Sequence, residues 1–224
     1  MAIILNINTA FETALVTVSS DDEILVEAQS DSQKDHSSFL EPAIKKLCDA
    51  LKISLNEIDA FAVVNGPGSY TGLRVGLSSA KALCYALQKP LILLNTLDVM
   101  AYALKFQSKS EEKNVIFCPL IDARRHEVHT ALYDYELNVV KTYSSEILDE
   151  HFLETERQTN KVITGGSGSI KWQKMVNDGN IVYINPLLLP KAIVILSNRA
   201  FIAGNFSRVV YSEPYYLKPV HFRK

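Results

Sequence analysis

Short apolar runs separated by polar turns open the chain. Each run is rich in aliphatic or β-branched residues and is followed by a polar turn, a pattern typical of strands. Tight turns between consecutive strands favour antiparallel pairing, so the sequence predicts a three-stranded meander. The predicted strands cover residues 3–7, 13–18 and 24–28.

Helical spacing then alternates with buried strands. Apolar residues recur every three or four positions between residues 37 and 51, which predicts an amphipathic helix. An apolar strand, a glycine-rich break and a second helix come next. The predicted elements are a helix at 37–51, a strand at 58–64, a helix at 71–87, a strand at 91–94 and a helix at 97–106.

A polar segment divides the sequence into two lobes. Residues 107–114 (QSKSEEKN) are polar and charged and contain no apolar anchor, which is typical of a linker. We therefore expect an N-terminal lobe at residues 1–106 and a C-terminal lobe at residues 115–224. The last helix of the C-terminal lobe is expected to pack back on the first lobe.

The order of elements in the first half recurs in the second half. Predicted strands at 115–121, 127–133 and 139–143 repeat the meander, and the glycines at 165–168 repeat the break at 65–68. This recurrence indicates an internal duplication. A meander followed by alternating helix and strand, present twice, predicts an α/β fold of two similar lobes.

Composition is that of an ordinary globular protein. The chain has 224 residues, of which 47% are apolar and 21% charged, and a net charge of −2. A strongly basic nucleic-acid-binding protein is excluded, so any RNA contact must be local or shared with a partner. Apolar runs stay short of the ~20 residues of a membrane span and the N-terminus lacks the marks of a signal peptide, so we expect a cytoplasmic protein.

The stretch from Asn65 to Leu87 (NGPGSYTGLRVGLSSAKALCYAL) is the most informative part of the sequence. Glycines between a strand and a helix permit positive φ and the close approach of a ligand or of another backbone. Ser69 or Tyr70 can cap the helix, whose first N–H groups favour an anion. The motif is not a P-loop, because Arg74 rather than a lysine stands in the first helical turn. A tight turn without a ligand remains an alternative.

The helix after this loop has small residues in its interior. A helical Gly costs up to ~1 kcal/mol relative to Ala, so close approach of another helix is the expected reason for Gly76. That helix belongs either to the core of the chain or to a partner subunit. On the partner interpretation, Gly76→Leu or Ala80→Arg abolishes the complex and leaves the fold intact. The interface would then comprise Leu40, Ile44, Leu47, Leu73, Gly76, Leu77, Ala80, Leu83 and Cys84.

The motif GPGSYTGLR-x-G-x-x-x-AK-x-L resembles the signature of the TsaB (YeaZ) family. Weaker blocks at 121–128, 165–168 and 213–217 extend the resemblance over essentially the whole chain. The family implies two lobes of the actin/Hsp70/sugar-kinase type (ASKHA, ribonuclease H-like), with mixed sheets flanked by helices. The residues of the family-motif loop are Gly66, Pro67, Gly68, Ser69, Tyr70, Thr71, Gly72 and Arg74.

The resemblance implies a non-catalytic subunit that binds and activates TsaD in threonylcarbamoyl transfer to the adenosine next to the tRNA anticodon. It further implies the ATPase TsaE in a larger complex and tRNA bound through that complex. No cofactor is expected, and the helical interface, being self-complementary, could give a homodimer when TsaD is absent. The alternatives are an independently active ASKHA-type kinase or metallopeptidase-like hydrolase, or a stand-alone RNA-binding module.

Catalytic residues are not expected. TsaD-like sequences carry two histidines four residues apart where this chain has Thr96 and Met100, which are poor metal ligands, so we expect no metal. Asn8 stands where family members commonly have Asp, which weakens any claim to independent nucleotide hydrolysis.

Two further regions could contact a ligand or a partner. The first comprises Asp122, Arg124, Arg125, Gly165 and Gly166, which could touch a nucleotide or a partner; a surface ion pair of Asp122 with the arginines is the alternative. The second is the end of the chain from Arg199 to Lys224, where basic residues alternate with aromatic ones. That composition suits a single-stranded RNA contact, although a solvated tail or a docking arm is the commoner explanation.

Overall fold

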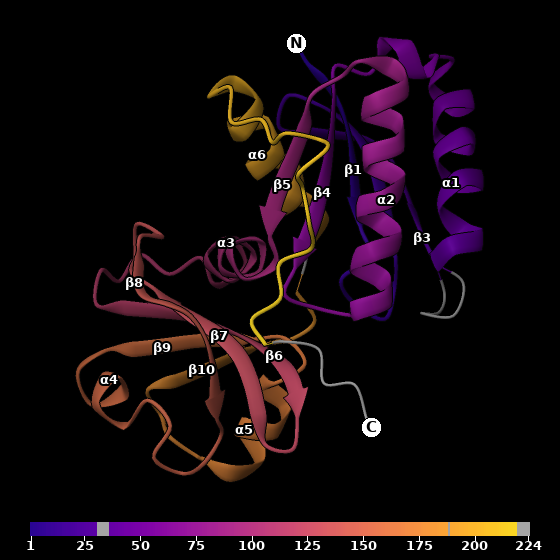
Figure 1. The fold of residues 1–224 in the computed structure, drawn as a ribbon. Coiled ribbons are helices and arrows are strands. Elements are labelled where there is room, and N and C mark those ends of the chain that lie inside the picture. Colours follow the sequence, from indigo (N-terminus) through magenta and orange to yellow (C-terminus); the bar gives the residue numbers. More distant parts are fainter. Residues whose placement is uncertain (31–35, 188, 219–224) are drawn as a thin grey trace, which may run out of the picture. The chain divides into compact units, whose positions relative to one another are not determined.

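The computed structural model describes residues 1–30, 36–187 and 189–218. Over these residues the chain divides into two compact units, each with a mixed five-stranded sheet (Figure 1). The first unit comprises Met1–Thr96 and Pro190–Tyr215. The second comprises Leu97–Leu189 and the described residues that follow Tyr215.

The first unit begins with the predicted meander. Its sheet has the order β3-β2-β1-β4-β5, in which β1 pairs antiparallel with β2 and parallel with β4. The elements are β1 (Ile3–Asn8), β2 (Leu15–Ser20), β3 (Glu23–Gln29), α1 (His36–Leu51), η2 (Leu55–Glu57), β4 (Ala60–Gly66), α2 (Tyr70–Leu87), β5 (Leu91–Asn95) and most of α6 (Leu189–Ile202).

The core of the first unit lies between its sheet and two helices. Every residue of β4 is buried, as expected for a parallel strand covered on both faces. Helices α1 and α2 lie side by side against this sheet and pack their apolar stripes on it (Figure 1). Among the described residues no helix combines the length and the apolarity needed to cross a membrane.

The second unit repeats this arrangement. Its sheet has the order β10-β9-β6-β7-β8, in which β6 pairs antiparallel with β7 and parallel with β9. The elements are α3 (Thr96–Ser108), β6 (Val115–Arg124), β7 (Glu127–Tyr133), β8 (Val139–Ile147), α4 (Glu154–Thr159), β9 (Lys161–Gly165), α5 (Ser169–Met175) and β10 (Ile181–Ile184).

The two sheets have the same topology. Starting from the third strand of each meander, the orders β3-β2-β1-β4-β5 and β8-β7-β6-β9-β10 correspond strand for strand. In both sheets the first strand of the meander is central and pairs with one antiparallel and one parallel neighbour. The predicted α/β class with two similar mixed sheets flanked by helices is therefore confirmed.

The division between the units differs from the linker at 107–114 that the polarity of that segment suggested. Helix α3 belongs to the second unit, because the Asp98 carboxylate accepts hydrogen bonds from the Tyr133 hydroxyl at 2.6 Å and the Tyr143 hydroxyl at 2.9 Å. Most of α6 belongs to the first unit, where Lys191 forms an ion pair with Glu23 at 2.8 Å. A polar segment marks a surface loop, whereas the unit boundary depends on which side chains pair.

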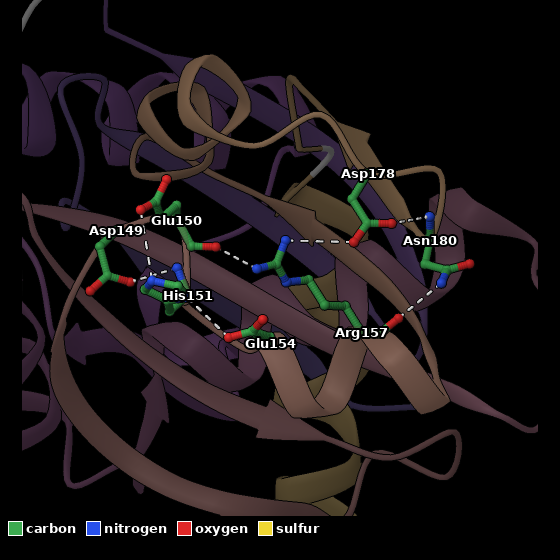
Figure 2. A network of polar contacts seen from close by, with 7 residues as sticks. All are labelled: Asp149, Glu150, His151, Glu154, Arg157, Asp178 and Asn180. Atoms are coloured by element: carbon green, nitrogen blue, oxygen red, sulfur yellow. Dashed lines mark hydrogen bonds and ion pairs between the residues drawn. The ribbon is translucent and has the colours of Figure 1, made fainter.

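A polar network holds the segment after β8 in place (Figure 2). Arg157 on α4 donates to the backbone carbonyl of Glu150, and its guanidinium lies 3.5 Å from the Asp178 carboxylate. The same carboxylate accepts a hydrogen bond from the Asn180 backbone N–H at 2.9 Å. Asn180 in turn donates its side-chain N–H to the Arg157 carbonyl at 2.9 Å. The network therefore joins the end of β8, α4 and the connection between α5 and β10.

We predict that Asp98→Ala lowers the free energy of unfolding by about 1–3 kcal/mol, because it leaves the Tyr133 hydroxyl without its acceptor in a largely buried position. Chemical denaturation followed by circular dichroism measures the change. Glu111→Ala, which removes an exposed carboxylate, is the matched control and should change stability by less than about 0.5 kcal/mol. Equal stability of the two variants would show that Asp98 does not anchor α3.

Candidate functional site

The family-motif loop connects β4 to α2 by an abrupt turn. Gly66 has a φ of +128°, and the following Gly66–Pro67 peptide bond is cis. The Ser69 hydroxyl accepts a hydrogen bond from the Gly72 N–H at 3.3 Å, so Ser69 is the N-cap of α2. This confirms one of the two caps that the sequence offered. In the first turn of α2, the Arg74 guanidinium lies 4.1 Å from the centre of the Tyr70 ring.

The glycines of the motif let the chain pack closely against itself. A Cβ atom on Gly68 would lie within 3.0 Å of the Ala10 carbonyl oxygen, and one on Gly72 within 3.0 Å of the Thr9 carbonyl oxygen. One helical turn further on, a Cβ on Gly76 would meet the Thr9 hydroxyl. Real Cβ atoms essentially never come this close to other atoms. The absent side chains thus admit the turn after β1, and that turn takes up the space beside these glycines.

The end of the described chain covers the other side of the loop. The Tyr215 N–H donates to the Asn65 carbonyl at 2.8 Å, and the Asn65 side chain donates to the Glu213 carbonyl at 3.3 Å. A Cβ on Gly66 would meet the Tyr215 carbonyl oxygen. For this region the sequence offered a single-stranded RNA contact, a solvated tail or a docking arm; in the structure, residues 207–215 belong to the first unit, and an RNA contact stays a prediction. Arg223 and Lys224 lie outside the described residues.

Most of the residues proposed for a partner interface lie in the core of the chain itself. Eight of them, including Gly76, are buried; the other seven of these are no more than 4% exposed, and Leu83 is partly buried. Gly76 and Ala80 therefore pack against residues of the chain itself, which agrees with the packing explanation, and in this structure they expose little or no surface to a partner. The buried residues are Leu40, Ile44, Leu47, Leu73, Gly76, Leu77, Ala80 and Cys84.

The exposed side of α2 carries small residues and one large aromatic residue. Ser78, Ala82 and Ala86 follow one another at helical spacing, and Tyr85 beside them is 72% exposed. The Lys81 ammonium donates to the carbonyls of residues 210 and 212, which places the exposed side chains of Val210 and Tyr211 near this part of α2. Sequence spacing alone could not show this surface, because it joins α2 to a segment about 130 residues away.

Polar groups at the first turn make hydrogen bonds within the protein. The Asn8 side-chain oxygen accepts from the Ala10 N–H at 3.1 Å, and the Thr9 hydroxyl donates to the Gly72 carbonyl at 2.7 Å. His36 begins α1, where its Nε2 atom lies 3.1 Å from the Glu12 carbonyl oxygen. These side chains hold α1 and α2 against the turn.

Thr96 and Met100, at the positions expected for metal ligands in the catalytic relatives, are buried. Met100 packs where Gly166 has no side chain. In the part of the chain that the structure describes, no group of three or more His, Cys, Asp or Glu residues could hold a metal ion. Burial raises the pKa of the Cys84 and Cys118 thiols to about 12, so both stay protonated near neutral pH.

The candidate residues of the second unit fall into two groups. Gly165 and Gly166 are packing positions, because a Cβ on either would lie within 3.0 Å of the carbonyl oxygen of Ile184 or Leu120. Asp122 accepts hydrogen bonds from the Lys171 ammonium at 2.7 Å and the Arg124 N–H at 2.8 Å. Partial burial opposes the ionised form of Asp122, but these hydrogen bonds outweigh it and lower its pKa. Asp122 thus forms its ion pair with Lys171, whereas the alternative drawn from the sequence paired it with Arg124 and Arg125.

Comparison with known proteins gives a consistent family. The family model described as "TsaD: tRNA N6-adenosine threonylcarbamoyltransferase" matches residues 25–211. The TsaB protein of Escherichia coli is 27% identical, with alignment over 96% of this chain and 94% of that protein. The TsaB protein of Bacillus subtilis is 30% identical, and the aligned part covers 59% of this chain and 56% of the relative.

Solved structures agree on the fold. A protein of Pseudomonas aeruginosa described as similar to peptidase YEAZ superposes with a TM-score of 0.81 at 23% identity, over 97% of this chain and all of that one. A polyphosphate/ATP-glucomannokinase of Arthrobacter superposes with a TM-score of 0.51 at 12% identity, over 91% of this chain and all of the kinase. At these identities the similarities concern the fold alone, which this chain shares with a sugar kinase.

We predict that Gly76→Leu destabilises the protein by about 1–3 kcal/mol or more, because the new side chain would collide with Thr9 in a closely packed region. Thermal unfolding measured by circular dichroism tests this. Ser78→Leu adds the same side chain to an exposed position of α2 and should leave the melting temperature nearly unchanged. A Gly76→Leu protein as stable as the parent would contradict the packing described here.

Proposed function

Since this chain belongs to the tRNA N6-adenosine threonylcarbamoyltransferase (TsaD) family, and within it to the TsaB/YeaZ group, we propose that it serves tRNA threonylcarbamoyladenosine biosynthesis as a non-catalytic subunit that binds and activates TsaD. The similarity to TsaB proteins over nearly the whole chain supports the pathway. The filled glycine loop of the first unit supports the non-catalytic role.

The non-catalytic role is supported by what occupies the positions that catalysis would use. Thr96 and Met100 are buried and cannot replace a pair of imidazole ligands. Asn8 is neutral, and its side chain already accepts a backbone hydrogen bond from Ala10. We propose that catalysis takes place on TsaD and that this chain contributes a binding surface to the complex.

We propose the exposed side of α2 as the surface that binds TsaD. Small side chains at Ser78, Ala82 and Ala86 allow a partner helix to approach closely. Tyr85, Val210 and Tyr211, each more than 70% exposed, supply large apolar or aromatic groups beside them. Interfaces commonly combine such aromatic anchors with close packing, and apolar side chains grouped at a surface often mark an interaction site.

The remaining parts of the proposal follow from the same assignment. When TsaD is absent, this face could pair with a second copy of the chain, because a surface that suits a related partner can be self-complementary. We further propose TsaE as a component of a larger complex, tRNA as a ligand reached through the complex, and the cytoplasm as the location.

We predict that Ala82→Arg abolishes the complex with TsaD of the same organism, because a long charged side chain would stand where the partner must pack. Size-exclusion chromatography of the mixed proteins measures complex formation. Gln173→Arg adds the same side chain to an exposed position of α5 and should leave the complex intact. Normal TsaD binding by the Ala82→Arg protein would place the interface elsewhere.

We predict that the purified chain alone has negligible ATPase activity and transfers no threonylcarbamoyl group to tRNA. Transfer should appear when TsaD, threonylcarbamoyl-adenylate and tRNA are added, and should fall when the Ala82→Arg protein replaces the parent. Mass spectrometry of nucleosides from the digested tRNA provides the measurement. Robust turnover by the chain alone, after contaminants are excluded, would refute the non-catalytic role.

A further inference from the structure

The tip of the β6–β7 hairpin has an unusual backbone. Three consecutive residues, Arg124, Arg125 and His126, have φ values of +73°, +47° and +63°. Two-residue hairpins with positive φ at the tip are usually built from Asn-Gly or Asp-Gly, because other side chains are strained there. This turn consists instead of two arginines and a histidine. It thus keeps two guanidinium groups at positions where Asn or Gly would make the turn more stable. Such strain concentrates at functional sites.

The guanidinium groups of the two arginines form no direct pair within the described part of the chain, although the positive charges act at longer range on Asp122 and Glu127. Both side chains are exposed, and neither guanidinium forms a hydrogen bond or ion pair with a described residue. The two nearest acidic residues already have other partners. Asp122 is paired with Lys171 at 2.7 Å, and Glu127 is paired with Lys218 at 2.5 Å.

The acidic residues that follow the neighbouring strand β8 also have other partners. The N–H of Leu148 donates to the His126 carbonyl at 2.7 Å, so the segment after β8 runs beside the tip. Within that segment, the Asp149 carboxylate accepts from the His151 N–H at 2.9 Å, and the Glu150 carboxylate lies 3.7 Å from the His151 ring (Figure 2). Arg124 and Arg125 thus stand as a cationic pair on a chain whose net charge is −2.

We propose that this hairpin tip binds the phosphate backbone of RNA through Arg124 and Arg125. Guanidinium groups match phosphate oxygens in geometry, and phosphate contacts position a protein on a nucleic acid without reading its sequence. The tip projects at the end of two strands and carries no apolar side chain, so it lacks both the enclosure of a nucleotide pocket and the apolar centre of a protein interface. This inference rests on the proposed function, which makes tRNA the RNA concerned.

The test compares two double variants of the full chain, each with two fewer positive charges. Arg124→Ala with Arg125→Ala removes the proposed contacts, whereas Lys109→Ala with Lys113→Ala removes exposed lysines from the 107–114 region and serves as the control. Bulk bacterial tRNA is titrated into each protein, alone and mixed with TsaD, over a series of salt concentrations. We expect the arginine variant to bind about tenfold more weakly or worse near 0.1 M salt, with a log–log salt slope smaller by about 2. The lysine variant should behave like the parent.

A third variant separates the charge of the tip from its backbone. Arg125→Asn with His126→Gly supplies the residues that this turn prefers, so it should raise the melting temperature and still weaken tRNA binding. A variant that is more stable and binds tRNA less well excludes unfolding as the cause of the loss.

Several outcomes would overturn the inference. The first is that the parent chain binds no tRNA, either alone or with TsaD. The second is that the arginine and lysine variants bind tRNA with equal affinity. The third is that the arginine variant no longer binds TsaD but keeps its affinity for tRNA. The last result would identify the tip as a protein contact. Failure of the proposed function is distinguishable, because the parent chain would then neither bind nor stimulate TsaD, and the titration of the chain alone would still decide whether the tip binds tRNA.

Discussion

Helix α2 lies so close to the turn after β1 that no side chain fits between them. Gly68, Gly72 and Gly76 follow at intervals of four residues and face Thr9 and Ala10, and the Thr9 hydroxyl bonds to the Gly72 carbonyl. The Ser69 N–H also donates to the Ala10 carbonyl, at 2.8 Å. This close approach fixes the distance between α2 and the sheet, and so determines which residues of α2 are buried. The arrangement of the first unit therefore depends on it.

In the second unit, glycines again allow a loop to pack closely against a strand, although the neighbouring side chains differ. Gly166 and Gly168 lie against the backbone of Leu120, within β6, the strand that corresponds to β1. Met100 fills the space beside Gly166, in the unit where α3 is anchored through Asp98. In both units, a glycine loop joins a strand to a helix, an arrangement that can receive a ligand. The protein's own residues occupy the space beside each of these loops. An accessory role is consistent with this packing, since a subunit that supplies a surface needs a rigid fold more than an open pocket.

The surfaces left over differ in chemistry between the units. On the first unit, the exposed groups beside α2 are small or aromatic, which suits close packing against another protein. On the second unit, the β6–β7 tip presents guanidinium groups without apolar neighbours at the tip, which suits a polyanion. These two surfaces therefore suit the two kinds of partner proposed above, a protein on the first unit and an RNA on the second.

The sequence by itself determined both meanders, the helices and strands up to residue 106 and the recurrence of the glycine loop, because periodicity and turn residues act over short distances along the chain; it did not predict α4 or β10. It also identified the β4–α2 loop as the most informative segment, since glycines at a strand-to-helix turn are a local signal. It could not decide what packs against Gly76 and Ala80, because an apolar or small helical face looks the same whether it meets its own core or a partner. It also placed α3 in the first lobe, although the tyrosines that hold Asp98 lie 35 and 45 residues further along the chain. Only the tertiary structure assigned Lys171 to Asp122 and left the guanidinium groups of Arg124 and Arg125 exposed, because those pairings depend on distances in space.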